Sequence, residues 1–107
     1  MNKIYVVNYN SNNVTVIDGA SNHTATVEAG SGPMAIAVNS ASNNIYVANN
    51  LSNNTTVING ATNATSTIAV GTDPVAISLN QVSGKVYVAN AHDGTVTVIS
   101  GAASPGK

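Results

Sequence analysis

Apolar and polar positions alternate along this chain in short runs. Stretches of four to six residues rich in Val, Ile and Tyr are separated by clusters of Asn, Gly and Ser. This pattern is typical of short β-strands joined by tight turns. Apolar residues do not recur at helical spacing over any longer stretch, and helix caps do not flank the runs. We therefore expect strands throughout the chain and almost no helix.

The pattern repeats at a spacing of 41 residues, and the first 41-residue unit aligns with the second without a gap, with 21 identical positions. One motif marks each unit. It is Ile-Tyr-Val-Val-Asn, Ile-Tyr-Val-Ala-Asn or Val-Tyr-Val-Ala-Asn, at 4–8, 45–49 and 86–90. We interpret residues 1–107 as a single array of repeats. Its units are 4–44, 45–85 and, in part, 86–107.

Each unit contains four apolar runs and so predicts four short strands. Around the middle of the chain we place them at 34–39, 45–49, 55–59 and 66–70. A repeat of this length with four strands is typical of one blade of a β-propeller, which is a sheet of four antiparallel strands.

Asn, Asp and Gly predict the turns between these strands. We expect positive φ at Asp18-Gly19 and at its counterpart Asn59-Gly60, because these residue types tolerate it. A glycine and a proline mark each crossing from one unit to the next: Gly30, Pro33, Gly71 and Pro74.

Several motifs of the units resemble a known repeat, the YVTN-type β-propeller repeat of archaeal and bacterial surface-layer proteins and other extracellular proteins. The similar motifs are Tyr-Val-Ala-Asn at 46–49, Thr-Val-Ile at 15–17 and 56–58, Val-Gly-x-x-Pro at 70–74 and Ala-Ile-Ala-Val-Asn at 35–39. The resemblance covers residues 4–101. It departs from the family after the inner strands, where the usual Pro-Asp-Gly turn is replaced at 40–44 and 81–85.

The resemblance implies that the strands of each blade run from the centre of the propeller outwards. The segments at 34–39 and 75–80 would be inner strands, and their small residues suit a crowded centre: Ala35, Ala37, Ala76 and Ser78. The chain would then hold ten strands, or two and a half blades. Propellers close with four or more blades. We therefore expect an all-β, incomplete propeller that further chain or self-association completes.

Composition excludes several classes of partner and chemistry. Only 7% of the residues are charged, the net charge is −1 and arginine is absent. Electrostatic binding to nucleic acid or to an anionic membrane is therefore not expected. Cysteine is also absent, which removes disulfides, thiolate metal sites and thiol catalysis. No run of apolar residues is long enough to span a membrane. Because no signal peptide precedes the first strand, we expect either a cytoplasmic protein or a piece of a longer, exported one.

Titratable side chains are few. His23 and His92 occupy different repeat positions, and we interpret both as solvated loop residues. The adjacent pair His92-Asp93 is the better candidate for a function, although neighbours on a loop make a poor catalytic dyad. We assign Asp18 and Asp73 to turns and Glu28 to the protection of a sheet edge. Phosphate-binding, calcium-binding and nucleophile motifs are absent, so we expect no catalytic residue, no metal and no cofactor.

Tyrosine and asparagine recur at fixed repeat positions. Tyr5, Tyr46 and Tyr87 share one position, which indicates packing between neighbouring blades or, alternatively, a stacking platform for a sugar or base. Six asparagines lie in Asn-x-Ser/Thr sequences and would accept glycans in a secreted chain. Alternatively, asparagine is simply the loop residue of this repeat. The six are Asn13, Asn22, Asn50, Asn53, Asn54 and Asn63.

The leading hypothesis is a non-enzymatic, extracellular structural or adhesive propeller segment, similar to those of surface layers. Its partners would be further blades, a second copy, or a cell-surface protein or glycan. The alternative is a module that binds a ligand or protein through its loops or centre. A fragment of a propeller enzyme, similar to a streptogramin lyase, is a third hypothesis, and its chemistry would need residues that this chain does not contain.

Overall fold

The computed structural model describes residues 2–100, and these residues form ten β-strands and no helix, as the sequence predicts. The strands are β1 (Lys3–Asn8), β2 (Asn13–Asp18), β3 (Thr24–Glu28), β4 (Pro33–Asn39), β5 (Asn44–Asn49), β6 (Asn54–Asn59), β7 (Thr65–Ala69), β8 (Pro74–Leu79), β9 (Val86–Asn90) and β10 (Thr95–Ile99). The end of the predicted partial unit, from residue 101 onwards, lies outside the described residues.

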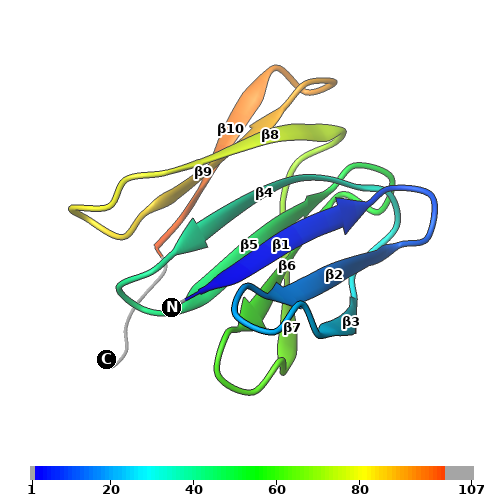
Figure 1. The fold of residues 1–107 in the computed structure, drawn as a ribbon. Coiled ribbons are helices and arrows are strands. Elements are labelled where there is room, and N and C mark those ends of the chain that lie inside the picture. Colours follow the sequence, from blue (N-terminus) through cyan, green and yellow to red (C-terminus); the bar gives the residue numbers. More distant parts are fainter. Residues whose placement is uncertain (1, 101–107) are drawn as a thin grey trace.

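The ten strands form three antiparallel sheets of consecutive strands (Figure 1). The N-terminal sheet has the order β1-β2-β3, the middle sheet β4-β5-β6-β7 and the C-terminal sheet β10-β9-β8. The middle sheet is a whole four-stranded blade. The N-terminal sheet lacks a counterpart of β4, and the described C-terminal sheet lacks a counterpart of β7. The predicted all-β, incomplete propeller is confirmed.

Strand β5 explains how the sheets stack. Its side chains alternate between the two faces of the sheet, as in any strand, yet both sets are buried. Ile45 and Val47 are 0% exposed and join a core shared with the N-terminal sheet. Tyr46 and Ala48 point the other way and join a core shared with the C-terminal sheet. A sheet covered on both faces is what a blade between two neighbours requires.

Each of the two cores combines side chains from facing sheets. The first contains Val14, Val16 and Val27 of the N-terminal sheet with Ile45, Val47 and Ile58 of the middle sheet. The second contains Tyr46 and Ala48 of the middle sheet with Val86, Val88 and Ile99 of the C-terminal sheet. Fully burying one Val or Ile side chain contributes about 1.5–3 kcal/mol. The apolar runs of the sequence therefore stabilise the stack of sheets.

The turn between β2 and β3 corrects one expectation. Positive φ falls on Asn22 (64°) rather than on Asp18-Gly19, and its counterpart Asn63 (64°) behaves in the same way. Asp18 contributes through its side chain, because Oδ1 accepts hydrogen bonds from backbone amides of the turn. Gly19 is needed for a close approach: a Cβ there would lie 2.2 Å from Oδ1 of Asn2. In this turn the asparagine adopts the left-handed backbone conformation, and the glycine leaves room for a neighbouring side chain.

Candidate functional site

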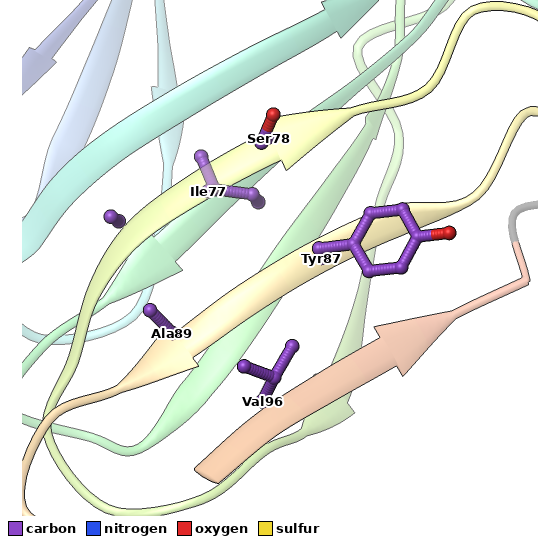
Figure 2. Close-up of a pocket in the computed structure, with 6 residues that line it drawn as sticks. Ile77, Ser78, Tyr87, Ala89 and Val96 are labelled. Carbon is purple, nitrogen blue, oxygen red and sulfur yellow. The ribbon is translucent and has the colours of Figure 1, made fainter. Parts of the chain in front are cut away.

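The outer face of the C-terminal sheet is apolar, and no other part of residues 2–100 covers it. Its side chains are brought to one side by the register of β8, β9 and β10, which pairs Tyr87 with Ser78 and with Val98. Val96 and Val98 are 60% and 52% exposed. We call this surface the tyrosine face, and it consists of Ala76, Ser78, Tyr87, Ala89, Val96 and Val98. Figure 2 shows Tyr87 on β9 between Ser78 and Val96, at a shallow cavity of about 190 Å³.

The counterpart of this face in the middle sheet is buried at its centre. Tyr46 stands 41 residues before Tyr87, and Ala48 stands 41 residues before Ala89. Tyr46 is only 2% exposed and Ala48 is 0% exposed, because the C-terminal sheet covers them. The tyrosine face of the C-terminal sheet is therefore the counterpart of a surface that packs against a neighbouring sheet.

The N-terminal sheet exposes the complementary surface. Ile4 and Val6 of β1 are 46% and 42% exposed, and the register of β1 and β2 places Thr15 and Ile17 beside them. We call these four residues the isoleucine face. Their counterparts in the middle sheet are buried in the first core or beside it, at 0–4% exposure: Ile45, Val47, Thr56 and Ile58. Each end of the stack thus exposes one of the two faces that meet inside it.

In each sheet, hydrogen bonds of an asparagine side chain fix the loop between two neighbouring strands. Asn49 is 0% exposed, and its Nδ2 donates hydrogen bonds to Oδ1 of Asn54 (2.8 Å) and Oγ1 of Thr56 (2.9 Å). Asn8 and Asn90 donate to the residues five and seven positions further on in the same way. The last residue of the Tyr-Val-Ala-Asn motif therefore holds two strands together, which the sequence alone did not reveal.

A crossing glycine covers this network from the preceding unit. A Cβ at Gly30 would lie 2.7 Å from Nδ2 of Asn49, and one at Gly71 would lie 2.8 Å from Nδ2 of Asn90. Oδ1 of Asn49 and of Asn90 is buried without a hydrogen-bond partner in the described part of the chain. The crossing glycines and these asparagines thus form a tightly packed pair at both junctions.

The six asparagines of the Asn-x-Ser/Thr sequences differ in their surroundings. Asn22 and Asn53 are exposed, whereas the other four are half-buried. Nδ2 of Asn50 donates hydrogen bonds to Oδ1 of Asp73 and to the Pro74 carbonyl. Oδ1 accepts a hydrogen bond in Asn13, Asn53 and Asn54, while Oδ1 of Asn63 is buried without a partner among residues 2–100. Asn22 therefore has the most accessible amide.

The structure brings His23 close to groups that are distant in sequence. Lys3, Asp18, His23 and, from the next unit, Asn63 line a cavity of about 200 Å³ together with neighbouring side chains. Two of these groups are already engaged, since Asp18 accepts turn amides and Nζ of Lys3 donates to the Gly60 carbonyl at 3.2 Å. His23 itself is exposed and lies in a loop, as expected, but the sequence did not show that it shares a cavity with these groups.

The second histidine does not pair with its neighbour. Oδ2 of Asp93 accepts a hydrogen bond from the Thr72 amide at 2.8 Å, so Asp93 anchors the segment that crosses from the middle sheet to the C-terminal sheet. The side chain of His92 is exposed. Asp73 has a positive φ of 62° in its turn, and Glu28 is exposed on the edge strand β3. Within residues 2–100, no group of three or more His, Asp and Glu side chains could hold a metal ion.

One tyrosine has a perturbed hydroxyl. Tyr5 packs against the first core, and its hydroxyl is buried without a hydrogen-bond partner among the described residues. Burial raises the pKa of this hydroxyl above its ordinary value of 10.0. Tyr5 and Tyr46 therefore take part in packing between sheets, whereas Tyr87 is left on the open face.

Comparison with known proteins supports the architecture. No protein-family model and no curated protein matches the chain. Among solved structures, Kuenenia stuttgartiensis hydrazine synthase, a β-propeller-containing protein, is similar with a TM-score of 0.78 and 24% sequence identity. The match covers 83% of this chain and 26% of that chain, so this chain spans about a quarter of its relative. At this identity the likeness shows the fold alone.

Proposed function

We propose that this chain is a YVTN-type propeller segment with a non-enzymatic, structural or adhesive role at the cell surface. One observation carries the proposal. The same pair of faces meets at both sheet junctions, and the two ends expose one face of each kind. A unit built in this way is suited to continuing a stack, either with the remaining blades of a longer chain or with another copy.

The exposed loops support a position outside the cell. The turns are rich in Asn, Ser and Thr, carry little charge, and present Asn22 in an exposed Asn-x-Thr sequence. Such loops interact with water and with neutral polar partners, so a cell-surface protein or glycan is the partner class we propose. We propose no nucleic-acid partner and no membrane insertion, because the chain has a net charge of −1 and few basic side chains.

A binding module is the second candidate. The shallow apolar cavity beside Tyr87 favours it, because an aromatic ring in an apolar hollow can receive a flat or aliphatic group. We do not propose for this chain the reaction after which hydrazine synthase is named. The polar groups that meet near His23 are used to hold turns and backbone, and we assign them a structural role.

Surface labelling tests the proposal. An epitope-tagged copy of the protein in its native host should react with a membrane-impermeant biotin reagent on intact cells. A double variant, His23→Ala with His92→Ala, should be displayed and should adhere as well as the original protein. Recovery of the protein only from the interior of lysed cells would contradict the surface location. Loss of function in a folded double variant would contradict the non-enzymatic role.

A further inference from the structure

The two end faces of this chain fit each other. At the second junction, the side of the middle sheet that carries Tyr46 packs against the side of the C-terminal sheet that carries Val86, Val88 and Ile99. At the first junction, the side of the N-terminal sheet that carries Tyr5 packs against the side of the middle sheet that carries Ile45, Val47 and Ile58. One pairing rule thus holds at both junctions. The face left over at the C-terminal end is the partner of the face left over at the N-terminal end.

We propose that a second copy of this chain docks head to tail, with its isoleucine face on the tyrosine face of the first copy. This inference rests on the proposed structural role and names the partner. The docked residues would be those whose internal counterparts are buried or half-buried. Val6 corresponds to Val47 and Val96 corresponds to Thr55, and both counterparts are 0% exposed.

The strands that form the buried centre of such a junction are present at both ends. The buried residues of the second core lie on β5 of the middle sheet and on β9 and β10 of the C-terminal sheet, and partly buried side chains of β4, β6, β7 and β8 pack against them. The counterparts of β9 and β10 in the N-terminal sheet are β1 and β2, which carry Ile4, Val6 and Ile17. The strands without counterparts, those equivalent to β4 and β7, lie at the inner and outer margins of the sheets. The junction can therefore form between β9 of one copy and β1 and β2 of the other, without the part that β8 contributes to the second core. The first core likewise forms with an N-terminal sheet that has no strand equivalent to β4.

The number of sheets favours a closed pair. Each copy contributes three sheets, so two copies give six and three copies give nine. Propellers typically have about four to eight blades. Two copies can each place a tyrosine face on the other's isoleucine face, which makes two identical head-to-tail junctions and covers both of these faces in each copy. Because neither face contains a charged residue, electrostatic repulsion does not oppose this contact.

Three matched valine-to-lysine variants test the docking. Val6→Lys puts a charge on the isoleucine face and Val96→Lys puts one on the tyrosine face. Val82→Lys is the control, because Val82 is 98% exposed in a loop. Each protein is first checked for β-structure by circular dichroism. Its mass is then measured by sedimentation equilibrium from micromolar to millimolar concentration.

The original chain should approach about 21 kDa, twice the 10.7 kDa of one copy. Val6→Lys and Val96→Lys should each raise the dissociation constant by at least about 30-fold, because either change buries an unpaired charge at both junctions. The control should stay within about twofold of the original chain. Mixing the two face variants should restore pairing in part, because one intact tyrosine face then meets one intact isoleucine face.

Several outcomes would overturn the inference. A chain that remains at 10.7 kDa throughout would show that a second copy does not cover these faces. Association that Val96→Lys abolishes and Val6→Lys leaves intact would indicate pairing between identical faces instead. Growth into long polymers would exclude the closed pair. None of these results bears on surface location or adhesion, so failure of the docking is distinguishable from failure of the proposed function.

Discussion

Replacing Asn49 by alanine should destabilise the fold by about 2 kcal/mol. The change removes two hydrogen bonds, from Nδ2 to Asn54 and to Thr56, from a side chain that is 0% exposed. Buried hydrogen bonds contribute about 0.5–1.5 kcal/mol each, so their loss costs about 1–3 kcal/mol. The small cavity left behind adds to this cost. Removal of the unpartnered Oδ1 offsets part of it, since an unpaired buried carbonyl is itself unfavourable.

Asn8→Ala is the matched control. Asn8 makes the equivalent bonds to Asn13 and Thr15, at 3.0 and 2.9 Å, but it is only half-buried, and no glycine among residues 2–100 packs on it as Gly30 packs on Asn49. Water can replace its lost bonds, so we expect a cost of about 0.5–1 kcal/mol. Urea unfolding should show a midpoint for Asn49→Ala lower by about 1 M with an unchanged slope. An equal or larger loss in Asn8→Ala would refute the role assigned to burial.

Four further predictions concern particular positions. Tyr5→Phe should leave neutral stability nearly unchanged. Because the raised pKa of Tyr5 makes the original protein lose stability as the pH rises above about 10, the variant should lose less there; parallel alkaline unfolding curves would contradict this. Gly71→Ala should lower the free energy of unfolding by about 1–3 kcal/mol, because the new Cβ would lie 2.8 Å from the side chain of Asn90. A loss smaller than that of a typical surface substitution would argue against this contact. Gly94→Asn should be neutral or stabilising by about 0.5 kcal/mol, because the site is open, its φ is 66° and the other two units have asparagine there. Thermal unfolding measures the stability of both glycine variants. In a secretory host that attaches N-linked glycans, mass spectrometry should find a glycan on Asn22 and little on Asn50, whose Nδ2 makes two hydrogen bonds; the reverse occupancy would contradict the structure.

The strands could be predicted from the sequence because two periodicities agree. Alternation within each run indicates a strand, and the 41-residue repeat shows that each run occurs again in the same context. Strand boundaries around the middle sheet differ from the prediction by no more than one residue, for example at Thr65–Ala69 against 66–70. The incomplete propeller followed from counting these runs.

The turn geometry could not be predicted as well. Both Asn22 and Gly19 tolerate positive φ, and local sequence does not decide between them. The need for glycine at position 19 comes instead from a contact outside the turn, because the side chain of Asn2 approaches Gly19 and leaves no room for a Cβ. Long-range packing of this kind is absent from a pattern of neighbouring residues.

The candidate site was also only partly predictable. Recurrence of Tyr46 and Tyr87 indicated packing between blades, and burial of Tyr46 agrees with it. The stacking of the sheets decides which side of each sheet the tyrosines occupy. It also leaves the tyrosine face of the C-terminal sheet open, which the sequence pattern does not show. Likewise, His23 and Asn63 are 40 positions apart and meet only because neighbouring sheets lie side by side.

Contacts between Tyr46 and the C-terminal sheet test the central claim most directly. Because Tyr46 and the methyl-bearing residues Val86, Val88 and Ile99 belong to one core, a nuclear Overhauser spectrum of labelled protein should contain cross-peaks between the Tyr46 ring and these methyl groups. Strand-to-strand cross-peaks within each sheet serve as the internal control. If these control peaks are present and the Tyr46 ring shows no contact with the C-terminal sheet, the sheets do not stack through the tyrosine face.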